Sequence, residues 1–134
     1  ISVVGHSLGG LYSRYMLALL PPDFVAAYHW DTFLTLASPH LGIRRPQLWA
    51  RPFDLVFQGC AGCIPHFTSA HEMFLVDGPT PPLLHVMATD DRFLSNLRRF
   101  ERRVCYANVW WDFQVPCSTA SIRAHNPYRR RPGR

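Results

Sequence analysis

Lysine is absent from this chain of 134 residues, so all 14 of its basic side chains are arginines. Set against nine acidic residues, they give a formal net charge of +5. Because both basic residues serve on ordinary protein surfaces, biased nucleotide composition is the simplest explanation for the missing lysine. Four arginines fall within the last six residues, and such charge runs are usually solvated. We therefore expect a basic tail and no nucleic-acid partner.

The sequence also shows no signal peptide and no apolar run long enough to span a bilayer. Its apolar content of 48% is typical of a globular protein, and its length suffices for one domain with a core. These features favour an intracellular protein. The chain has no initiator methionine and begins inside an apparent strand, so we expect any targeting signal to precede it.

The four cysteines could form two disulfides, but the chain is not a small scaffold dense in cysteine. Cys60 and Cys63 form a C-x-x-C that lacks the strand and helix of a redox motif. Together with His66 and His71 they could form a zinc site, because thiolate and imidazole are good zinc ligands. Ordinary loop cysteines are the preferred interpretation. We therefore expect no metal and no organic cofactor.

The first ten residues contain the pattern Gly-x-Ser-x-Gly, between a short apolar stretch and a helical-looking segment. This is the layout of a nucleophile elbow, in which a strand reverses into a helix and holds a serine in a strained conformation. Gly5 and Gly9 would remove Cβ atoms that collide in so tight a turn. Ser7 would lie at a helix N-terminus, where backbone N–H groups stabilise an oxyanion. This context favours a catalytic serine over a structural glycine-rich turn.

Alternating strand and helix signals predict an α/β fold with a parallel sheet. Strands are expected over residues 1–4, 32–37 and 104–110, which are short, apolar and rich in β-branched or aromatic side chains. Helices are expected over residues 11–20 and from an N-cap at Thr89 onward. A right-handed crossover would place the second strand parallel to the first.

The first predicted helix has an apolar stripe at helical spacing, which consists of Leu11, Tyr15, Ala18 and Leu19.

Residues 43–82, by contrast, lose all periodicity and are rich in proline and aromatic residues. Long irregular segments in compact domains are often functional, so this one is interpreted either as a cover over an acyl-binding site or as an ordinary packed insertion.

A serine nucleophile needs a base to take its proton and a carboxylate to orient that base. Where an elbow serine is used, the chain order is serine, then aspartate or glutamate, then histidine. Asp112 follows the third predicted strand, and sites in parallel sheets gather at the carboxyl ends of strands. It is the candidate acid, with a turn-forming aspartate before Val115-Pro116 as the alternative.

The base has no convincing candidate. His125 alone follows Asp112, and no strand signal between them would carry it back to the serine. His6 is expected to pack structurally, and His40 comes before Asp112, against the expected order. An oxyanion hole needs the N–H of Leu8 and a second N–H from a loop after an earlier strand. We therefore expect the histidine and that loop to lie outside this chain.

Several blocks of sequence resemble one known family in the family's own order, together covering most of residues 1–123. They are Val4 to Leu11 with Arg14-Tyr15, Phe33 to Gly42, Phe74 to Asp77, Pro82 to Leu84 with Met87 to Asp90, Arg103 to Asn108, and Asp112 to Pro116 with Thr119 to Arg123. The family is that of the serine esterases that include the ROG-type lipases, within the α/β-hydrolase superfamily. The resemblance implies that Ser7 is the nucleophile and Asp112 the triad acid.

The resulting prediction is a partial α/β-hydrolase fold over residues 1–123, with a basic disordered tail over 124–134. The mostly parallel sheet has flanking helices and lacks the N-terminal strands and the strand that leads to the histidine. The expected function is cleavage of acyl esters, in particular lipid esters, through a Ser-Asp-His triad. A thioesterase or acyltransferase on the same triad is the alternative, as is an inactive fragment or interaction module. Peripheral membrane contact and the oligomeric state stay open.

Overall fold

The computed structural model describes residues 1–43, 81–112 and 114–128 as a small α/β domain built on a three-stranded parallel sheet. The strands are β1 (Val3–His6), β2 (Thr32–Leu36) and β3 (Arg102–Tyr106), in that spatial order. Both pairs of neighbours run parallel, which confirms the predicted arrangement. The sheet and its flanking helices are compatible with a partial α/β-hydrolase fold.

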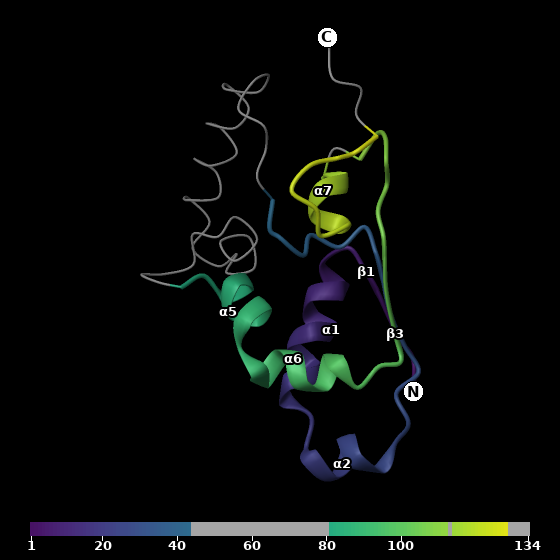
Figure 1. Cartoon of the computed structure of the whole chain (residues 1–134), viewed down its shortest axis with the longest axis vertical. Helices are drawn as coiled ribbons and strands as arrows, with labels where there is room; N and C mark the ends of the chain where they lie inside the picture. The colour runs from purple at the N-terminus through teal and green to yellow at the C-terminus, as the bar shows by residue number, and fades with distance from the viewer. Residues whose placement is uncertain (44–80, 113, 129–134) are drawn as a thin grey trace, which may run out of the picture.

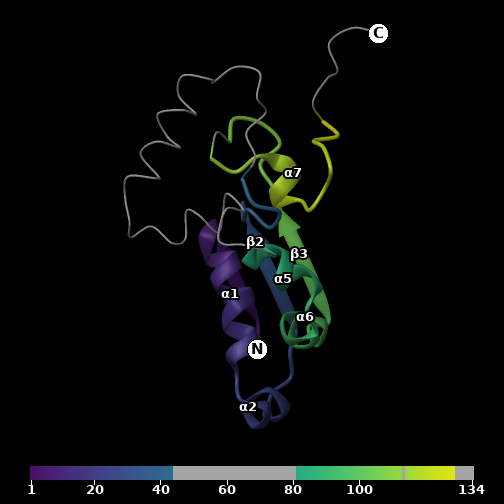
Figure 2. The same ribbon diagram turned by 90° about the vertical axis from the view of Figure 1, so that its left-hand side faces the viewer.

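The longer helices cover one face of this sheet. Figure 1 shows α1 (Leu8–Leu19), α5 (Leu83–Thr89) and α6 (Asp91–Arg98) on the same side of the strands. The two short helices lie at opposite ends, with α2 (Pro22–Ala27) before the strands begin and α7 (Cys117–Ala120) beyond their carboxyl ends (Figure 2). The carboxyl edge of the sheet is therefore where elements from both halves of the chain meet.

The buried face of α1 differs from the predicted stripe. Leu11, Arg14 and Leu17 are buried, whereas Tyr15 and Leu19 are exposed. The prediction was wrong at Tyr15 and Leu19 because an arginine occupies the centre of the buried face. Hydrophobic periodicity does not count a guanidinium as a core group, so the predicted stripe is rotated about the helix axis from the buried face. The prediction holds at Leu11, which is buried, and at Ala18, which packs against the core.

Aromatic packing fixes the sheet to the helices at the end near α2. The ring of Phe100 contacts those of Trp30 and Phe33, with centroids 5.1 and 5.5 Å away. Leu17 and Val25 complete this cluster. A second cluster joins α1 to α5 and α6 and consists of Leu11, Leu84, Met87 and Phe93. The first cluster packs α1 against β1 and β2, and the second packs it against α5 and α6.

Most element boundaries differ from the predictions by a few residues: β1 covers residues 3–6 rather than 1–4, α1 covers 8–19 rather than 11–20, and β2 ends at 36 rather than 37. Two further differences change the surroundings of the helices and of the carboxyl edge. The third strand ends at Tyr106 rather than at residue 110, so a longer loop follows it. Helix α6 is capped by Asp90, whose side chain accepts a hydrogen bond from the Arg92 N–H at 2.8 Å, while Thr89 ends α5. Most of the segment predicted as a cover or insertion over residues 43–82, namely 44–80, lies outside the described residues, as does the last part of the predicted tail, 129–134.

Candidate active site

Ser7 alone connects β1, which ends at His6, to α1, which begins at Leu8. Its backbone has φ 52° and ψ −128°, a combination that costs a residue with a Cβ roughly 1–3 kcal/mol. Hydrogen bonds on both sides hold it there: the Ser7 N–H donates to the Leu36 carbonyl at 2.8 Å, and its carbonyl accepts from the Gly10 N–H at 3.2 Å. The strand, the strained serine and the helix thus have the geometry that the motif predicts.

The glycines around Ser7 are not equivalent. A Cβ on Gly5 would lie 2.5 Å from the Gly10 Cα, so backbone meets backbone there. A Cβ on Gly10 would collide with the Ser38 side chain. At Gly9 a Cβ would meet nothing within 4 Å. The expectation that Gly5 and Gly9 both avoid a collision is therefore wrong for Gly9, and Gly10, outside the five-residue pattern, has the steric role instead.

A pocket of about 550 Å³ opens beside Ser7 at the carboxyl edge of the sheet. This volume lies within the range of small-molecule binding sites. Ser7 from the elbow and Asp112 from the loop after β3 both line it, so the structure brings together two predicted site residues from opposite ends of the chain. The other residues lining the pocket are His6, Ala37, Asn108, Trp111, Gln114 and Val115.

The Asp112 carboxylate is held by three hydrogen bonds. Its Oδ1 accepts from the N–H groups of Gln114 and Val115, at 3.1 and 2.8 Å, and its Oδ2 accepts from the Asn108 amide at 2.9 Å. Burial by itself would raise the pKa of Asp112, but these bonds and the nearby His6 outweigh it and leave the pKa below its ordinary value. Asp112 is thus an ionised carboxylate in a fixed orientation.

A second polar cluster lies buried behind the elbow. His40 Nε2 lies 2.8 Å from Thr35 Oγ1, and its Nδ1 lies 3.3 Å from a guanidinium nitrogen of Arg14. Because arginine can only donate, Nδ1 is the acceptor and Nε2 carries the proton. Burial, and next the charge of Arg14, lower the pKa of His40 to about 4. A second nitrogen of Arg14 donates to the Met87 carbonyl at 2.9 Å, which ties α1 to α5.

This cluster excludes His40 as a base. Both of its ring nitrogens are engaged, and its side chain does not line the pocket. His6, which was expected to pack structurally, is exposed and lines the pocket, so that expectation was wrong. His125 is exposed and is not among the lining residues. Within the described ranges no hydrogen bond joins the Ser7 hydroxyl to a histidine, so the source of the base stays a prediction.

Leu8, the predicted oxyanion donor, is the first residue of α1. The Ser7 side chain makes no capping bond to this helix, so the first turn is not capped by it. Among the described residues no three histidine, cysteine or acidic side chains lie close enough to hold a metal ion, and the cysteine and histidine set around residues 60–71 lies outside them. None of the described helices combines the length and apolarity needed to cross a membrane.

Sequence reasoning missed the residues that support the site. Asn108 holds Asp112 from four residues earlier in the same loop, and Trp111 lines the pocket with a φ of 62°. The burial of Arg14 has no signal in the sequence, because arginine is among the most exposed residue types. Only Trp111 carried a signal, because it follows the end of the strand predicted over residues 104–110, and side chains of parallel sheets converge at that end. Asn108 fell inside that predicted strand and is in the loop only because β3 ends at Tyr106.

The fold and the pocket together define a class of protein. It is an α/β protein in which a strained serine follows the first strand and lies beside a carboxylate held by hydrogen bonds. The family described as "Putative serine esterase (DUF676)" matches residues 1–122. The chain belongs to this family, which confirms the resemblance seen in the sequence.

Relatives of the chain include two yeast proteins named as lipases. It is 34% identical over 127 residues to "Putative lipase YDL109C" of Saccharomyces cerevisiae, covering 91% of this chain and 18% of the relative. It is 30% identical over 129 residues to "Putative lipase C4A8.10" of Schizosaccharomyces pombe, covering 91% and 16%. The chain thus spans less than a fifth of the length of these relatives. No solved structure matches it.

Proposed function

We propose that the protein is an ester hydrolase in which Ser7 is the nucleophile and Asp112 the acid of a Ser-Asp-His triad, acting on acyl esters of lipids. The observation that carries this proposal is that the strained Ser7 and the hydrogen-bonded Asp112 line one pocket. The chain order, serine before aspartate, is the order of α/β-hydrolases. We also propose that the three strands are part of such a domain, with β1 as the elbow strand.

In the proposed reaction the Ser7 hydroxyl oxygen bonds to the carbonyl carbon of the ester, while its proton passes to a histidine. Asp112, kept ionised by its three hydrogen bonds, orients that histidine and stabilises its cation. The Leu8 N–H donates to the oxygen that becomes negative. The histidine returns its proton to the departing alcohol, and water then cleaves the acyl-serine ester.

The names of the relatives support a lipid ester as substrate, because those proteins are named as lipases. The pocket volume also suits an acyl chain of modest length. We place the proposed histidine in a part of the protein other than the described residues, since His40 is enclosed and His125 lies outside the pocket. His6 lines the pocket, but among the described residues no hydrogen bond joins it to Ser7 or Asp112.

Reaction of the chain with a fluorophosphonate probe and with a short p-nitrophenyl ester tests the proposal. Labelling and turnover should disappear in Ser7→Ala and persist in Ser95→Ala, which removes an exposed hydroxyl on α6. If the chain is inert and a longer form of the protein is labelled at Ser7, the histidine is supplied from outside the chain. If neither form is labelled, the hydrolase proposal is wrong.

A further inference from the structure

Residues 37–42 follow β2 and form a buried stretch of chain, here called the bridge segment. Ser38 and Pro39 are fully buried, and His40 is 4% exposed. Two hydrogen bonds within the segment fix its shape: the His40 N–H donates to the Ser38 carbonyl at 2.9 Å, and the Gly42 N–H donates to the Pro39 carbonyl at 3.0 Å. The bridge segment therefore has a defined conformation, and the elements that it contacts are held in a defined arrangement.

At its start the bridge segment is joined to the nucleophile elbow. The Ser7 N–H donates to the carbonyl of Leu36, the residue directly before the segment, at 2.8 Å. Ser38 packs against the first turn of α1 so closely that a Cβ on Gly10 would collide with it. The position of Ser7 is thus fixed relative to the bridge segment.

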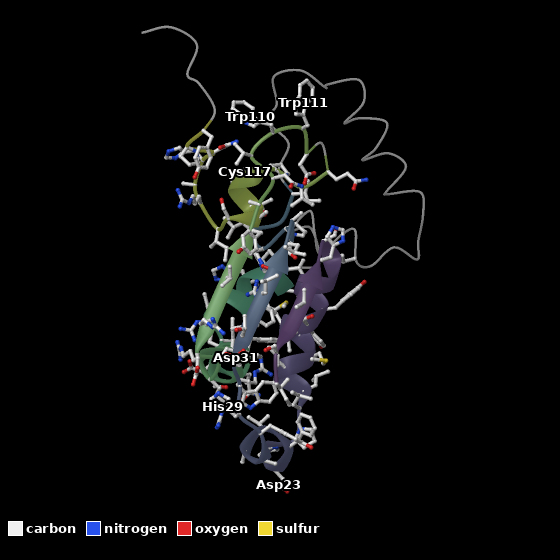
Figure 3. The ribbon with its side chains drawn as sticks, turned by 90° about the vertical axis from the view of Figure 1, so that its right-hand side faces the viewer. Asp23, His29, Asp31, Trp110, Trp111 and Cys117 are labelled. Carbon is white, nitrogen blue, oxygen red and sulfur yellow. The ribbon has the colours of Figure 1, made fainter. Side chains whose placement is uncertain are left out.

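At its other end the bridge segment is joined to α7. The Leu41 N–H donates to Oγ1 of Thr119 at 2.9 Å, and Thr119 is buried, with 5% of its surface exposed. Figure 3 shows Cys117, the first residue of α7, at the same end of the molecule as Trp111, whereas Asp31, which precedes β2, lies at the opposite end. The bond to Thr119 therefore acts at the end of the molecule where the candidate site lies.

Helix α7 also continues directly from the residues that hold Asp112. The Val115 N–H donates to Asp112 Oδ1 at 2.8 Å, and Val115 is 5% exposed. The next residue, Pro116, accepts the N–H bonds of Thr119 and Ala120 at 3.1 and 3.2 Å. A displacement of α7 would therefore move the backbone N–H that holds the Asp112 carboxylate.

From the side of β3, Asp112 is held less directly. Residues 107–111 separate it from the end of the strand, and the Asn108 amide that holds its Oδ2 belongs to this same loop. The bond between Leu41 and Thr119 thus provides a separate attachment, from the interior of the protein, for the part of the chain that holds Asp112.

We propose that Thr119 is a positioning residue of the candidate active site, which holds α7 and the Asp112 loop at a fixed distance from Ser7 through its bond to Leu41. Triad chemistry depends on such distances, because a displacement of about 1 Å can slow a reaction about a hundredfold. Thr119 is not among the residues that line the pocket, so it would act without touching the substrate. This inference rests on the proposed function, since it assigns a role in the same reaction.

Steady-state kinetics with a short soluble p-nitrophenyl ester test this role, in whichever form of the protein Ser7 is labelled. Thr119→Val keeps the shape of the side chain and removes the oxygen that accepts from Leu41. Its kcat should fall roughly tenfold while its KM changes less than about twofold, because the pocket lining is kept and only the reacting groups are displaced. Thr119→Ser keeps the hydroxyl and should return kcat to within about twofold of the wild type.

Ser121→Ala is the matched control, because it removes a hydroxyl that donates to the Cys117 carbonyl at 2.6 Å and so stays within the same short helix and its cap. It should keep the wild-type kcat. Urea unfolding shows that each variant is folded under the assay conditions, so a loss of stability alone would leave kcat unchanged. Thr119→Ala is a smaller variant that removes the same oxygen, and it replaces Thr119→Val in the test if that variant does not fold.

A wild-type kcat in the variants without the Thr119 oxygen would overturn the proposal. A loss in Thr119→Ser as large as that in Thr119→Val would also overturn it, because the methyl group and not the hydroxyl would then be responsible.

Amide hydrogen exchange of the chain provides a readout that needs no turnover. The Val115 N–H should exchange about tenfold faster in Thr119→Val than in the wild type, and at the wild-type rate in Ser121→Ala. An unchanged rate in Thr119→Val would overturn the link between α7 and Asp112. If no form of the protein cleaves the ester, the hydrolase proposal is rejected, and the exchange rate of Val115 still decides whether Thr119 holds the Asp112 loop.

Discussion

The nucleophile elbow lies between a buried polar cluster, here called the closed side, and the pocket, here called the open side. On the closed side, His40 is enclosed between Thr35 and Arg14, and its pKa falls to about 4. On the open side, Asp112 faces the pocket, and its pKa is also lowered, although burial by itself would raise it. Both groups have perturbed pKa values, yet only one can reach a ligand.

The cause of each shift explains this difference. Burial lowers the pKa of His40 by disfavouring its cation, so the ring is kept neutral as a structural bridge. Three hydrogen bonds keep Asp112 ionised while its carboxylate borders a cavity. A perturbed pKa therefore indicates a functional group here only when the group also lines the pocket.

Asp112→Asn should produce the largest effect, because it removes the charge that stabilises the histidine cation and changes the group that orients it. In whichever form of the protein Ser7 is labelled, kcat for a short soluble ester should fall about 10⁴-fold. Asp31→Asn is the control, since Asp31 pairs with Arg102 beside the opposite ends of the strands. Near wild-type turnover by Asp112→Asn would contradict the assigned role.

Gly10→Ala should disrupt the closed side. The new Cβ would collide with Ser38, so the free energy of unfolding should fall by about 1–3 kcal/mol, as measured by urea denaturation. The matched control is Gly9→Ala, which meets nothing within 4 Å in the same helix and should be neutral or gain up to about 1 kcal/mol. Equal losses in the two variants would show that the contact with Ser38 is not the cause.

The stability of the fold should depend on pH through His40. The pKa of His40 is about 4 in the folded protein and about 6.5 in the unfolded chain, so the unfolded state binds more protons between these values. The contribution of His40 to the free energy of unfolding is fully present above pH 6.5. About 3 kcal/mol of that free energy is lost as the pH falls towards 4.

His40→Gln keeps one donor and one acceptor but cannot titrate, so its unfolding free energy should vary less over this pH range. Exposed His85 on α5 provides the control His85→Gln, which should retain the wild-type dependence. A pH dependence that is unchanged in His40→Gln would mean that another group is responsible.

Asn108→Ala should have the smallest effect. It removes one of the three hydrogen bonds to Asp112, so the pKa of Asp112 should rise towards its ordinary value in an NMR titration. Because Asn108 is exposed, the loss of stability should be only about 0.5 kcal/mol. Asn126→Ala removes an amide that holds the same loop without touching Asp112, and should leave that pKa unchanged.

Much of the fold could be predicted because its signals are local. The β-branched run before Ser7 and the apolar run at residues 32–37 are strands, and they pair in parallel as expected. The buried face of α1 could not be predicted, because Arg14 is buried only through its bonds to His40 and Met87 from distant segments. Helices α2 and α7, of six and four residues, are too short to show a period.

By itself the sequence determined the elbow, because a five-residue pattern at the junction of a strand and a helix specifies a turn that strains its serine. It also placed Asp112 after a strand. The tertiary structure alone decided that Ser7 and Asp112 share a pocket, that His40 is closed off from it, and that Gly10 rather than Gly9 is sterically required. These features depend on which distant segments pack against a residue, and a local sequence pattern contains no information about those neighbours.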